Sequence, residues 1–290
     1  MWYNAVMESM RVKSYAKINL TLNITGSEGG YHMLDSVVTT VDLYDLIIIK
    51  KRKDSLVSVT MRGCGSENIA FSENNAALAA QAFTEKYSTD GADVTVYKNI
   101  PMGMGLGGSS ADAAGVLNGL FRLYKIDDVA GKKLLADRFG SDTRYMLTGG
   151  YARLFGRGNE VKALDGRLKL NLLLLDPKES VSTAQCYKKF EENGITGGNS
   201  DVAEKAVLCG DLRLLAANLN NALTDSACEL SDGVKKAIEE LKEFDPLAVN
   251  MTGSGSGVYA LFENAEFCRY AKSRYKGRFR LYELKTRLPR

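Results

Sequence analysis

The sequence predicts an α+β fold with two lobes. Its 290 residues suffice for one large domain or for two smaller ones that share a cleft. Hydrophobic residues make up 45% of the chain and charged residues 25%, close to the averages of proteins with an ordered core. Segments typical of strands and of helices occur in mixed order, without regular βα alternation, and this favours α+β over a parallel α/β sheet.

The first half of the chain is predicted to be rich in strands. Alternating or β-branched residues indicate strands at 12–24, 37–50, 57–61 and 94–96. An alanine-rich helix is expected over 74–87, with Ser72 as its N-cap. An apolar stripe at helical spacing predicts a second helix over 110–124, and a charged helix follows at about 129–139.

The second half mixes strands with more helices. Strands are expected within 151–164, joined by a turn at Gly156-Arg157-Gly158, and a buried strand is expected at 168–175. The clearest helix covers 233–244, with Ser231 or Asp232 as its cap. Further strands at 257–262 and 279–285 flank a helix at 265–275.

The expected lobes are residues 10–148 and 149–290, with a boundary near 148–151. Residues 1–9 precede a second methionine, Met10, and the first strand, so they are treated as an N-terminal extension.

Composition excludes several classes of function. With 38 basic and 35 acidic residues, the charge does not indicate nucleic-acid binding, and no membrane segment or partner protein is indicated. One histidine and five scattered cysteines do not provide the spacing of a structural zinc site, so no metal ligands are predicted. The odd cysteine count, without a secretory signal, favours a cytoplasmic location.

A glycine-serine stretch at residues 101–114 carries the strongest functional signal. Four glycines within six positions let the backbone approach a ligand, and a helix begins directly after them. The free N–H groups and the positive dipole end of that helix favour an anion, and phosphate is the usual one. The predicted phosphate-binding residues are Pro101, Gly103, Gly105, Leu106, Gly107, Gly108, Ser109 and Ser110.

Two other interpretations of this stretch stay open. Gly103, Gly105 and Gly108 fit the dinucleotide pattern G-x-G-x-x-G, but the parallel βαβ context that this pattern requires is missing. The stretch also lacks the Gly-Lys-Ser/Thr ending of a P-loop. A plain strand-to-helix turn is the third interpretation, although such a turn needs fewer glycines.

Together with two other segments, the stretch resembles the signature of the GHMP kinases, which phosphorylate small alcohols with ATP. Residues 251–257 (Met-Thr-Gly-Ser-Gly-Ser-Gly) resemble that family's C-terminal glycine motif, and residues 16–20 (Ala-Lys-Ile-Asn-Leu) resemble its N-terminal motif. The resemblance implies a two-lobed GHMP kinase fold, with a strand-rich N-terminal nucleotide-binding lobe and a C-terminal α/β lobe. It also implies ATP and Mg²⁺ as cofactors.

Further motifs, in order from about residue 11 to 285, resemble the branch of that family that acts on a small-molecule cytidyl diphosphate substrate. They are Gly30-Tyr31-His32, Asp42-Leu43, Gly140-Ser141-Asp142, Gly149-Gly150, Gly156-Arg157-Gly158 and Val181-Ser182-Thr183 with Tyr187.

The resemblance assigns roles to individual residues. It makes Asp142 the base that accepts the proton of the acceptor hydroxyl, and Lys17 its cationic neighbour. Read without the family, Asp142 could cap a helix and Lys17 could be a solvated charge. The implied substrate-binding residues are Asn19, Tyr31, His32, Thr183, Tyr187, Gly253, Ser254 and Gly255. Among these, Tyr31 and His32 are assigned to the cytosine, Tyr187 to its other face and Asn19 to the erythritol side.

Two positions depart from the family pattern. Thr143-Arg144-Tyr145 stands where the family usually has Val-Pro-Phe, and Tyr15 stands where it usually has proline. Arg144 could contact a substrate phosphate or face solvent. The alternatives are therefore another GHMP kinase, acting on homoserine, mevalonate or a sugar, and a catalytically weak nucleotide-binding homologue. A dinucleotide-dependent dehydrogenase is more distant.

Overall fold

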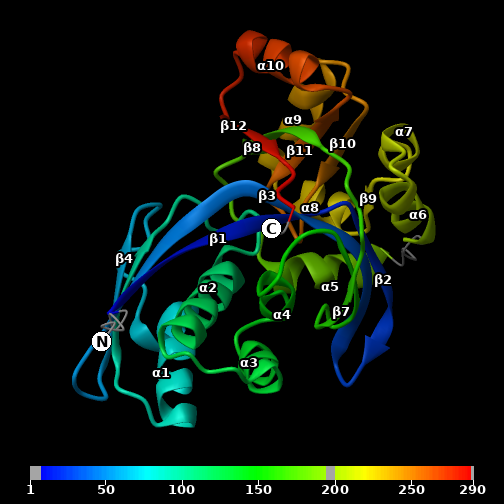
Figure 1. Ribbon diagram of the computed structural model, residues 1–290. Helices are drawn as coiled ribbons and strands as arrows, with labels where there is room; N and C mark the ends of the chain where they lie inside the picture. The colour runs from blue at the N-terminus through cyan, green and yellow to red at the C-terminus, as the bar shows by residue number, and fades with distance from the viewer. Residues whose placement is uncertain (1–7, 194–199, 289–290) are drawn as a thin grey trace. The chain divides into compact units, whose positions relative to one another are not determined.

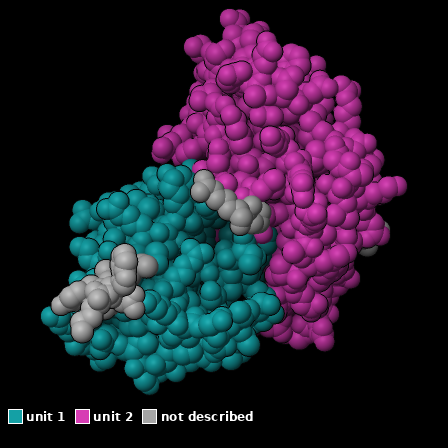
Figure 2. All heavy atoms as spheres, viewed as in Figure 1, with its two compact units in different colours: residues 1–15, 43–102, 108–148 teal, residues 16–42, 103–107, 149–290 magenta. Residues whose placement is uncertain are grey.

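The computed structural model describes residues 8–193 and 200–288 (Figure 1). Backbone contacts group the chain into two compact units (Figure 2). Unit 1 comprises residues up to Tyr15, Leu43–Met102 and Gly108–Thr148, and unit 2 comprises Ala16–Asp42, Gly103–Gly107 and the chain from Gly149 onward. Unit 1 therefore lies within the first 148 residues, whereas unit 2 adds two segments from that part of the chain to the residues from Gly149 onward. The contiguous domains 10–148 and 149–290 stay a prediction.

In unit 1, helices pack against one face of a sheet. The second half of β3 (Tyr31–Lys51) pairs antiparallel with β5 (Ala92–Tyr97), and β5 pairs parallel with β4 (Val57–Arg62). The helical elements are η1 (Phe71–Glu73), α1 (Asn75–Tyr87), α2 (Gly108–Leu123), α3 (Val129–Ala136) and the short α4 (Thr143–Met146). Branched side chains of the strands, such as Ile47 and Val94, pack in one core with Phe83 of α1 and Leu117 of α2.

The alanines of α1 explain how two helices fit over this sheet. Ala76, Ala79 and Ala80 are completely buried, and small side chains let α1 and α2 approach closely. The N-cap of α1 is Asn74, whose side chain accepts hydrogen bonds from the backbone of Ala76 and Ala77. The predicted cap, Ser72, was wrong, because it lies two residues earlier, in η1.

Unit 2 holds two groups of strands. In the first, the beginning of β3 pairs antiparallel with β2 (Thr21–Glu28) and β6 (Ala152–Gly156). There β6 pairs with β7 (Glu160–Ala163), and β2 pairs in parallel with β9 (Asn220–Asn221). The second group is an antiparallel sheet in the order β10 (Ala248–Met251), β11 (Val258–Phe262), β8 (Asn171–Asp176), β12 (Arg280–Lys285). The helices of unit 2 are α5 (Thr183–Asn193), α6 (Asp201–Cys209), α7 (Leu212–Ala216), α8 (Thr224–Leu230), α9 (Asp232–Lys242) and α10 (Ala265–Arg274).

The α+β class is confirmed, and the boundaries of some elements change. The strand predicted at 12–24 is two strands, because β1 covers Ser9–Asn19 and β2 starts at Thr21. β1 begins at Ser9, the last residue assigned to the N-terminal extension, and the Glu8 carbonyl accepts a hydrogen bond from Lys51 N; the extension itself stays a prediction. Residues 1–7 of that extension lie outside the described residues. The cap of α9 is Ser231, as predicted.

Candidate active site

Three sequence motifs meet at Asn19 in unit 2. Its Oδ1 accepts hydrogen bonds from Lys17 Nζ and from the backbone N–H of Gly253 (2.9 Å). Its Nδ2 donates to Ser36 Oγ (2.8 Å), and its backbone N–H donates to Thr252 Oγ1 (3.1 Å). Both Lys17 and Asn19 are 4% exposed, so these contacts are held inside the unit.

The glycine stretch joins the same cluster through its backbone. Leu106 O accepts a hydrogen bond from Lys17 N (3.0 Å), and Gly105 O accepts one from Thr252 Oγ1 (3.1 Å). A Cβ on Gly105 would lie 2.0 Å from Thr252 O, and one on Gly253 would lie 2.8 Å from Gly105 Cα. Two glycine motifs 148 residues apart therefore pack backbone against backbone, which any larger residue would prevent.

Replacing Gly105 by alanine is expected to lower the free energy of unfolding by about 3 kcal/mol or more. The added Cβ must displace the Thr252 carbonyl, and alanine is also strained at the φ of +67° that Gly105 adopts. Gly210→Ala is the matched control, because Gly210 has a φ of +76° but open space around its Cβ position. Its expected cost is about 1 kcal/mol. Urea unfolding of both variants measures the difference, and equal costs would contradict the packing argument.

Two of the predicted substrate-binding residues, Thr183 and Tyr187, lie on one face of α5, and each contacts another predicted residue. Thr183, Tyr187 and Glu191 are spaced four residues apart, so they project from the same side of the helix. Thr183 Oγ1 lies 2.8 Å from Ser254 Oγ of the C-terminal glycine motif. The Tyr187 ring stacks on His32, with centroids 4.5 Å apart and planes 14° apart, and His32 Nε2 lies 3.5 Å from Glu191 Oε1.

Tyr31 lies beside His32 but has a different neighbour. The Arg157 guanidinium stands 3.6 Å from the centre of the Tyr31 ring, in a cation–π arrangement. The ring is 55% exposed, so it can still contact a planar ligand. The Gly156-Arg157-Gly158 motif thus contributes a side chain to this region, whereas the sequence assigned no role to Arg157 itself.

In unit 1, the start of α2 lies close to the segment that carries Asp142. Asn75 Nδ2 donates to Ser109 Oγ (2.8 Å) and to the carbonyl of Phe139 (3.0 Å). A Cβ on Gly140 would lie 3.0 Å from Ser110 Oγ. Asn75 was not predicted as a site residue. Its only distinguishing feature in the sequence is that it directly follows Asn74, the asparagine that caps α1.

Asp142 stands at the N-terminus of α4 but makes no side-chain cap hydrogen bond. A capping role therefore does not explain why an aspartate occupies this position. Arg144, two residues on, donates from Nε to Asp137 Oδ1 (2.6 Å) and forms a second bond with Oδ2. The charge of Arg144 is therefore balanced within the protein, which favours the interpretation without a substrate phosphate. Tyr15, the other departure, packs edge-on against Tyr44, with centroids 5.4 Å apart.

Three buried ionisable side chains, Asp45, Lys98 and Asp112, link the backbone before the glycine stretch to the helix at its end. Lys98 precedes the stretch and Asp112 lies near its end, on α2, and Lys98 Nζ donates to Asp112 Oδ2 (2.7 Å). Lys98 also bonds Asp45, whose Oδ1 accepts the backbone N–H groups of Asn99 (2.6 Å) and Ile100 (2.9 Å). The side chains of all three are at most 5% exposed. The sequence did not reveal this cluster, because its members are 53 and 14 residues apart.

The cluster carries two carboxyl groups but one ammonium group. Burial raises the pKa of the Asp112 carboxyl to about 8, against the attraction of Lys98 and with the repulsion of Asp45. Burial opposes the charge of Lys98, but the two carboxyl groups keep its pKa above the usual value. Asp112 Oδ1 is buried without a hydrogen-bond partner among the described residues, which fits a protonated carboxyl.

The Asp112 pKa predicts a pH-dependent stability. Up to about pH 8 the folded protein keeps a proton on Asp112 that the unfolded chain, with a pKa of about 3.9, releases. Stability should therefore fall as pH rises, by about 1.4 kcal/mol for each pH unit and on the order of 4 kcal/mol between about pH 5 and pH 8. Asp112→Asn, which cannot ionise, should lose this part of the dependence. Urea unfolding at several pH values tests it, and parallel curves for the two proteins would contradict it.

The described residues give two further findings. No group of three or more His, Cys, Asp or Glu within residues 8–193 and 200–288 could hold a metal ion. None of the helices in this part of the chain is both long and apolar enough to cross a membrane.

The structure thus brings together many of the predicted site residues, each within one unit. Lys17, Asn19, Gly105, Leu106 and Gly253 form one cluster. Two pairs, His32 with Tyr187 and Thr183 with Ser254, form another along α5. Lys17 belongs to unit 2 and Asp142 to unit 1, so their pairing stays a prediction, as do the roles of all these residues.

Comparison with known proteins agrees with these motifs. Residues 74–141 match the model of the GHMP kinases N terminal domain, and residues 203–276 match that of the GHMP kinases C terminal domain. The chain is 35% identical over 266 residues to the 4-diphosphocytidyl-2-C-methyl-D-erythritol kinase of Caldanaerobacter subterraneus subsp. tengcongensis, covering 89% of each chain. It is 34% identical over 277 residues to the enzyme of that name from Clostridium tetani, covering 92% of this chain and 97% of the relative.

Solved structures share the fold. A crystal structure of 4-(cytidine 5'-diphospho)-2C-methyl-D-erythritol kinase superposes with a TM-score of 0.80 and 26% identity, covering 96% of this chain and 99% of that one. A homoserine kinase from Cytophaga hutchinsonii superposes with a TM-score of 0.73 at 14% identity, covering 100% of this chain and 98% of that one, which shows the fold alone. The chain is therefore a phosphotransferase of the GHMP kinase family, and within that family it belongs to the 4-diphosphocytidyl-2-C-methyl-D-erythritol kinases.

Proposed function

We propose that the protein transfers the γ-phosphate of ATP to the 2-hydroxyl of 4-diphosphocytidyl-2-C-methyl-D-erythritol, and that it does so in the cytoplasm. The choice of this substrate rests on the side chains along one face of α5. There the stacked pair of Tyr187 and His32 offers aromatic surface and ring nitrogens suited to a nucleobase. Thr183, on the same face, faces Ser254 of the glycine motif and supplies hydroxyl groups for polar parts of the substrate.

The glycine stretch is proposed to bind the phosphates of ATP. In unit 1, Gly108 begins α2, whose first N–H groups and dipole favour an anion. Mg²⁺ usually takes most of its ligands from substrate phosphates and water. The hydroxyl groups of Ser109 and Ser110 are oxygen ligands of the right kind nearby, and bound Mg²⁺ would offset the charge of the transferred phosphoryl group.

Asp142 is proposed as the base and Lys17 as the cation that offsets negative charge on the transferred group. Asn19 supports this role of Lys17, because its Oδ1 accepts a hydrogen bond from the ammonium group and holds it in place. The same oxygen binds Gly253 N, so the lysine is positioned by the loop that is proposed to close on the substrate.

A panel of acceptors tests the function. The purified protein is incubated with ATP, Mg²⁺ and, separately, the cytidyl substrate, homoserine, mevalonate and galactose, and ADP release is followed. We expect turnover of the cytidyl substrate alone, with a product that carries phosphate on the 2-hydroxyl by ³¹P NMR. Turnover of homoserine or mevalonate without turnover of the cytidyl substrate would overturn the proposal.

Tyr187→Leu tests the nucleobase contact. Leucine keeps apolar bulk but loses the flat ring, and stacking on an aromatic side chain contributes about 1–3 kcal/mol per base. We expect KM for the cytidyl substrate to rise about tenfold or more, with KM for ATP unchanged. Tyr270→Leu on α10, which replaces a tyrosine that is 63% exposed, serves as the control. An equal rise in both KM values would argue against a role specific to the cytidine.

A further inference from the structure

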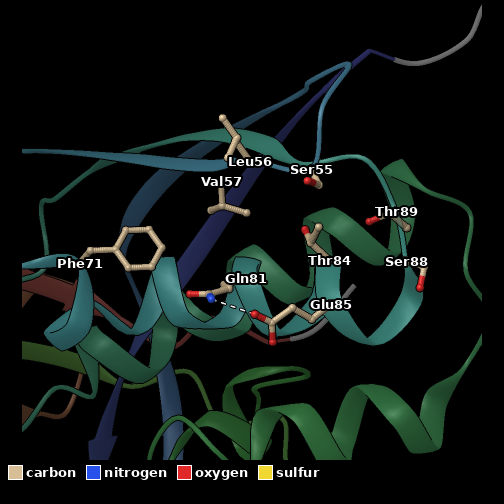
Figure 3. Close-up of a pocket in the computed structure, with 9 residues that line it drawn as sticks. All are labelled: Ser55, Leu56, Val57, Phe71, Gln81, Thr84, Glu85, Ser88 and Thr89. Carbon is tan, nitrogen blue, oxygen red and sulfur yellow. Dashed lines mark hydrogen bonds between the residues drawn. The ribbon is translucent and has the colours of Figure 1, made fainter.

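Unit 1 contains a pocket that none of the proposed ATP or substrate residues lines. Its volume is 680 Å³, within the range of small-molecule sites. It lies between the start of β4 and the second half of α1, and Figure 3 shows the side chains around it. They are Ser55, Leu56, Val57, Phe71, Gln81, Thr84, Glu85, Ser88 and Thr89.

The two ends of the pocket differ in chemistry. Phe71 lies at one end, and Thr84 and Thr89 lie toward the other (Figure 3). Phe71 is 43% exposed and Leu56 is 62% exposed, so both present apolar surface to a ligand in the pocket. An apolar ring could therefore be covered at the Phe71 end while a polar group reaches the threonines.

The hydroxyl groups of Thr84 and Thr89 lack hydrogen-bond partners among the described residues. Thr84 is 7% exposed, and its Oγ1, like that of Thr89, is buried with no hydrogen-bond partner among the described residues. A threonine within a helix commonly bonds the carbonyl four residues before it, but Thr84 does not. Buried hydroxyl groups without partners are unfavourable, so a ligand atom that bonds them would gain from their presence.

The charge of the residues that line the pocket favours a cationic ligand over an anionic one. Of the described residues that line the pocket, one carries a formal charge, Glu85, and its Oε1 accepts a hydrogen bond from Gln81 Nε2 (2.8 Å; Figure 3). A carboxylate favours a cation and disfavours phosphates. The pocket is also displaced from the glycine stretch within unit 1, since Gln81 follows Asn75, the residue that bonds Ser109, by six positions, about 9 Å along α1.

We propose that this pocket is a second ligand site, which takes a small organic amine carrying an apolar ring. The ring lies between Phe71 and Leu56, and the ammonium group donates to the hydroxyl oxygens of Thr84 and Thr89. The Glu85 carboxylate, which is turned toward Gln81, attracts the ammonium group without bonding it directly. The proposal does not depend on the acceptor that the kinase phosphorylates.

The test uses 2-phenylethylamine as the probe and 3-phenylpropionate as its anionic counterpart, each titrated into the full-length protein and followed by the backbone amide NMR signals of α1. We expect saturable binding of the amine, with a dissociation constant on the order of 1 mM for so small a ligand. The carboxylate should bind about tenfold more weakly or not at all. Saturating MgATP should leave the amine's affinity unchanged.

Two variants decide whether the named groups are responsible. Thr84→Val keeps the shape of the side chain and removes the hydroxyl, and Glu85→Gln removes the charge at an exposed position. Each should weaken amine binding about fivefold or more, whereas Thr60→Val, at an exposed site on β4, should change it less than twofold. Thr84→Val should also leave the melting temperature unchanged or raised, because the hydroxyl it removes has no partner. Absence of saturable binding, equal binding of the carboxylate, or affinity unaffected by both variants would overturn the proposal.

Discussion

Asp142→Asn is expected to lower kcat by about 10³-fold, the middle of the range for the loss of a general base. Asparagine has the same shape but cannot accept a proton from the acceptor hydroxyl. The fold should survive, because the Asp142 side chain makes no cap hydrogen bond with α4 and the segment is held from Phe139 O by Asn75. KM for ATP should change little, since the carboxylate is assigned to the acceptor.

The measurement is steady-state ADP release with saturating ATP and the cytidyl substrate, together with the melting temperature of each protein. Asp127→Asn is the matched control, an exposed aspartate of unit 1 that precedes α3. A fall in kcat of less than about tenfold in a folded Asp142→Asn protein would mean that the residue orients the hydroxyl without accepting its proton. The assignment of the protein as a kinase would be unaffected, but another residue would have to act as the base.

Local sequence patterns predicted the elements that their own residues determine. The β-branched run of β3, the four buried leucines of β8 and the serine cap of α9 each carry their signal within a few residues, and the structure contains all three. The cap of α1 was misplaced because Ser72 and Asn74 are both good cap residues two positions apart. Only the geometry of η1 decides between them.

The candidate site was predictable to the extent that it consists of motifs. Gly105, Gly253 and Asn19 each lie in a recognisable stretch, and their contacts explain why those stretches have that composition. Asn75 and Lys98 were missed, because an asparagine in a helix and a lysine after a strand have no local feature that distinguishes them from surface residues. Their roles arise from contacts with residues distant in sequence, which a single sequence does not display.

Lys98→Met is expected to lower the free energy of unfolding by about 3 kcal/mol or more, the typical cost of removing one partner from a buried ion pair. Methionine fills similar space but leaves Asp45 and Asp112 buried and facing each other without a cation. Protonation of Asp112, whose pKa is already raised, limits the cost, and the Asn99 and Ile100 N–H groups still bind Asp45. Urea unfolding measures the loss, with Lys133→Met on the exposed side of α3 as the control.

The same substitution separates stability from function. Lys98 joins the backbone before the glycine stretch to α2, which begins within the stretch, so its loss should also raise KM for ATP by more than KM for the cytidyl substrate. Combining Lys98→Met with Asp112→Asn should restore part of the stability, because one of the two uncompensated carboxyl groups is removed, but not the KM for ATP, because the link between the two ends of the stretch stays broken. If the double variant recovered both, the cluster would serve the stability of unit 1 alone and would not position the stretch.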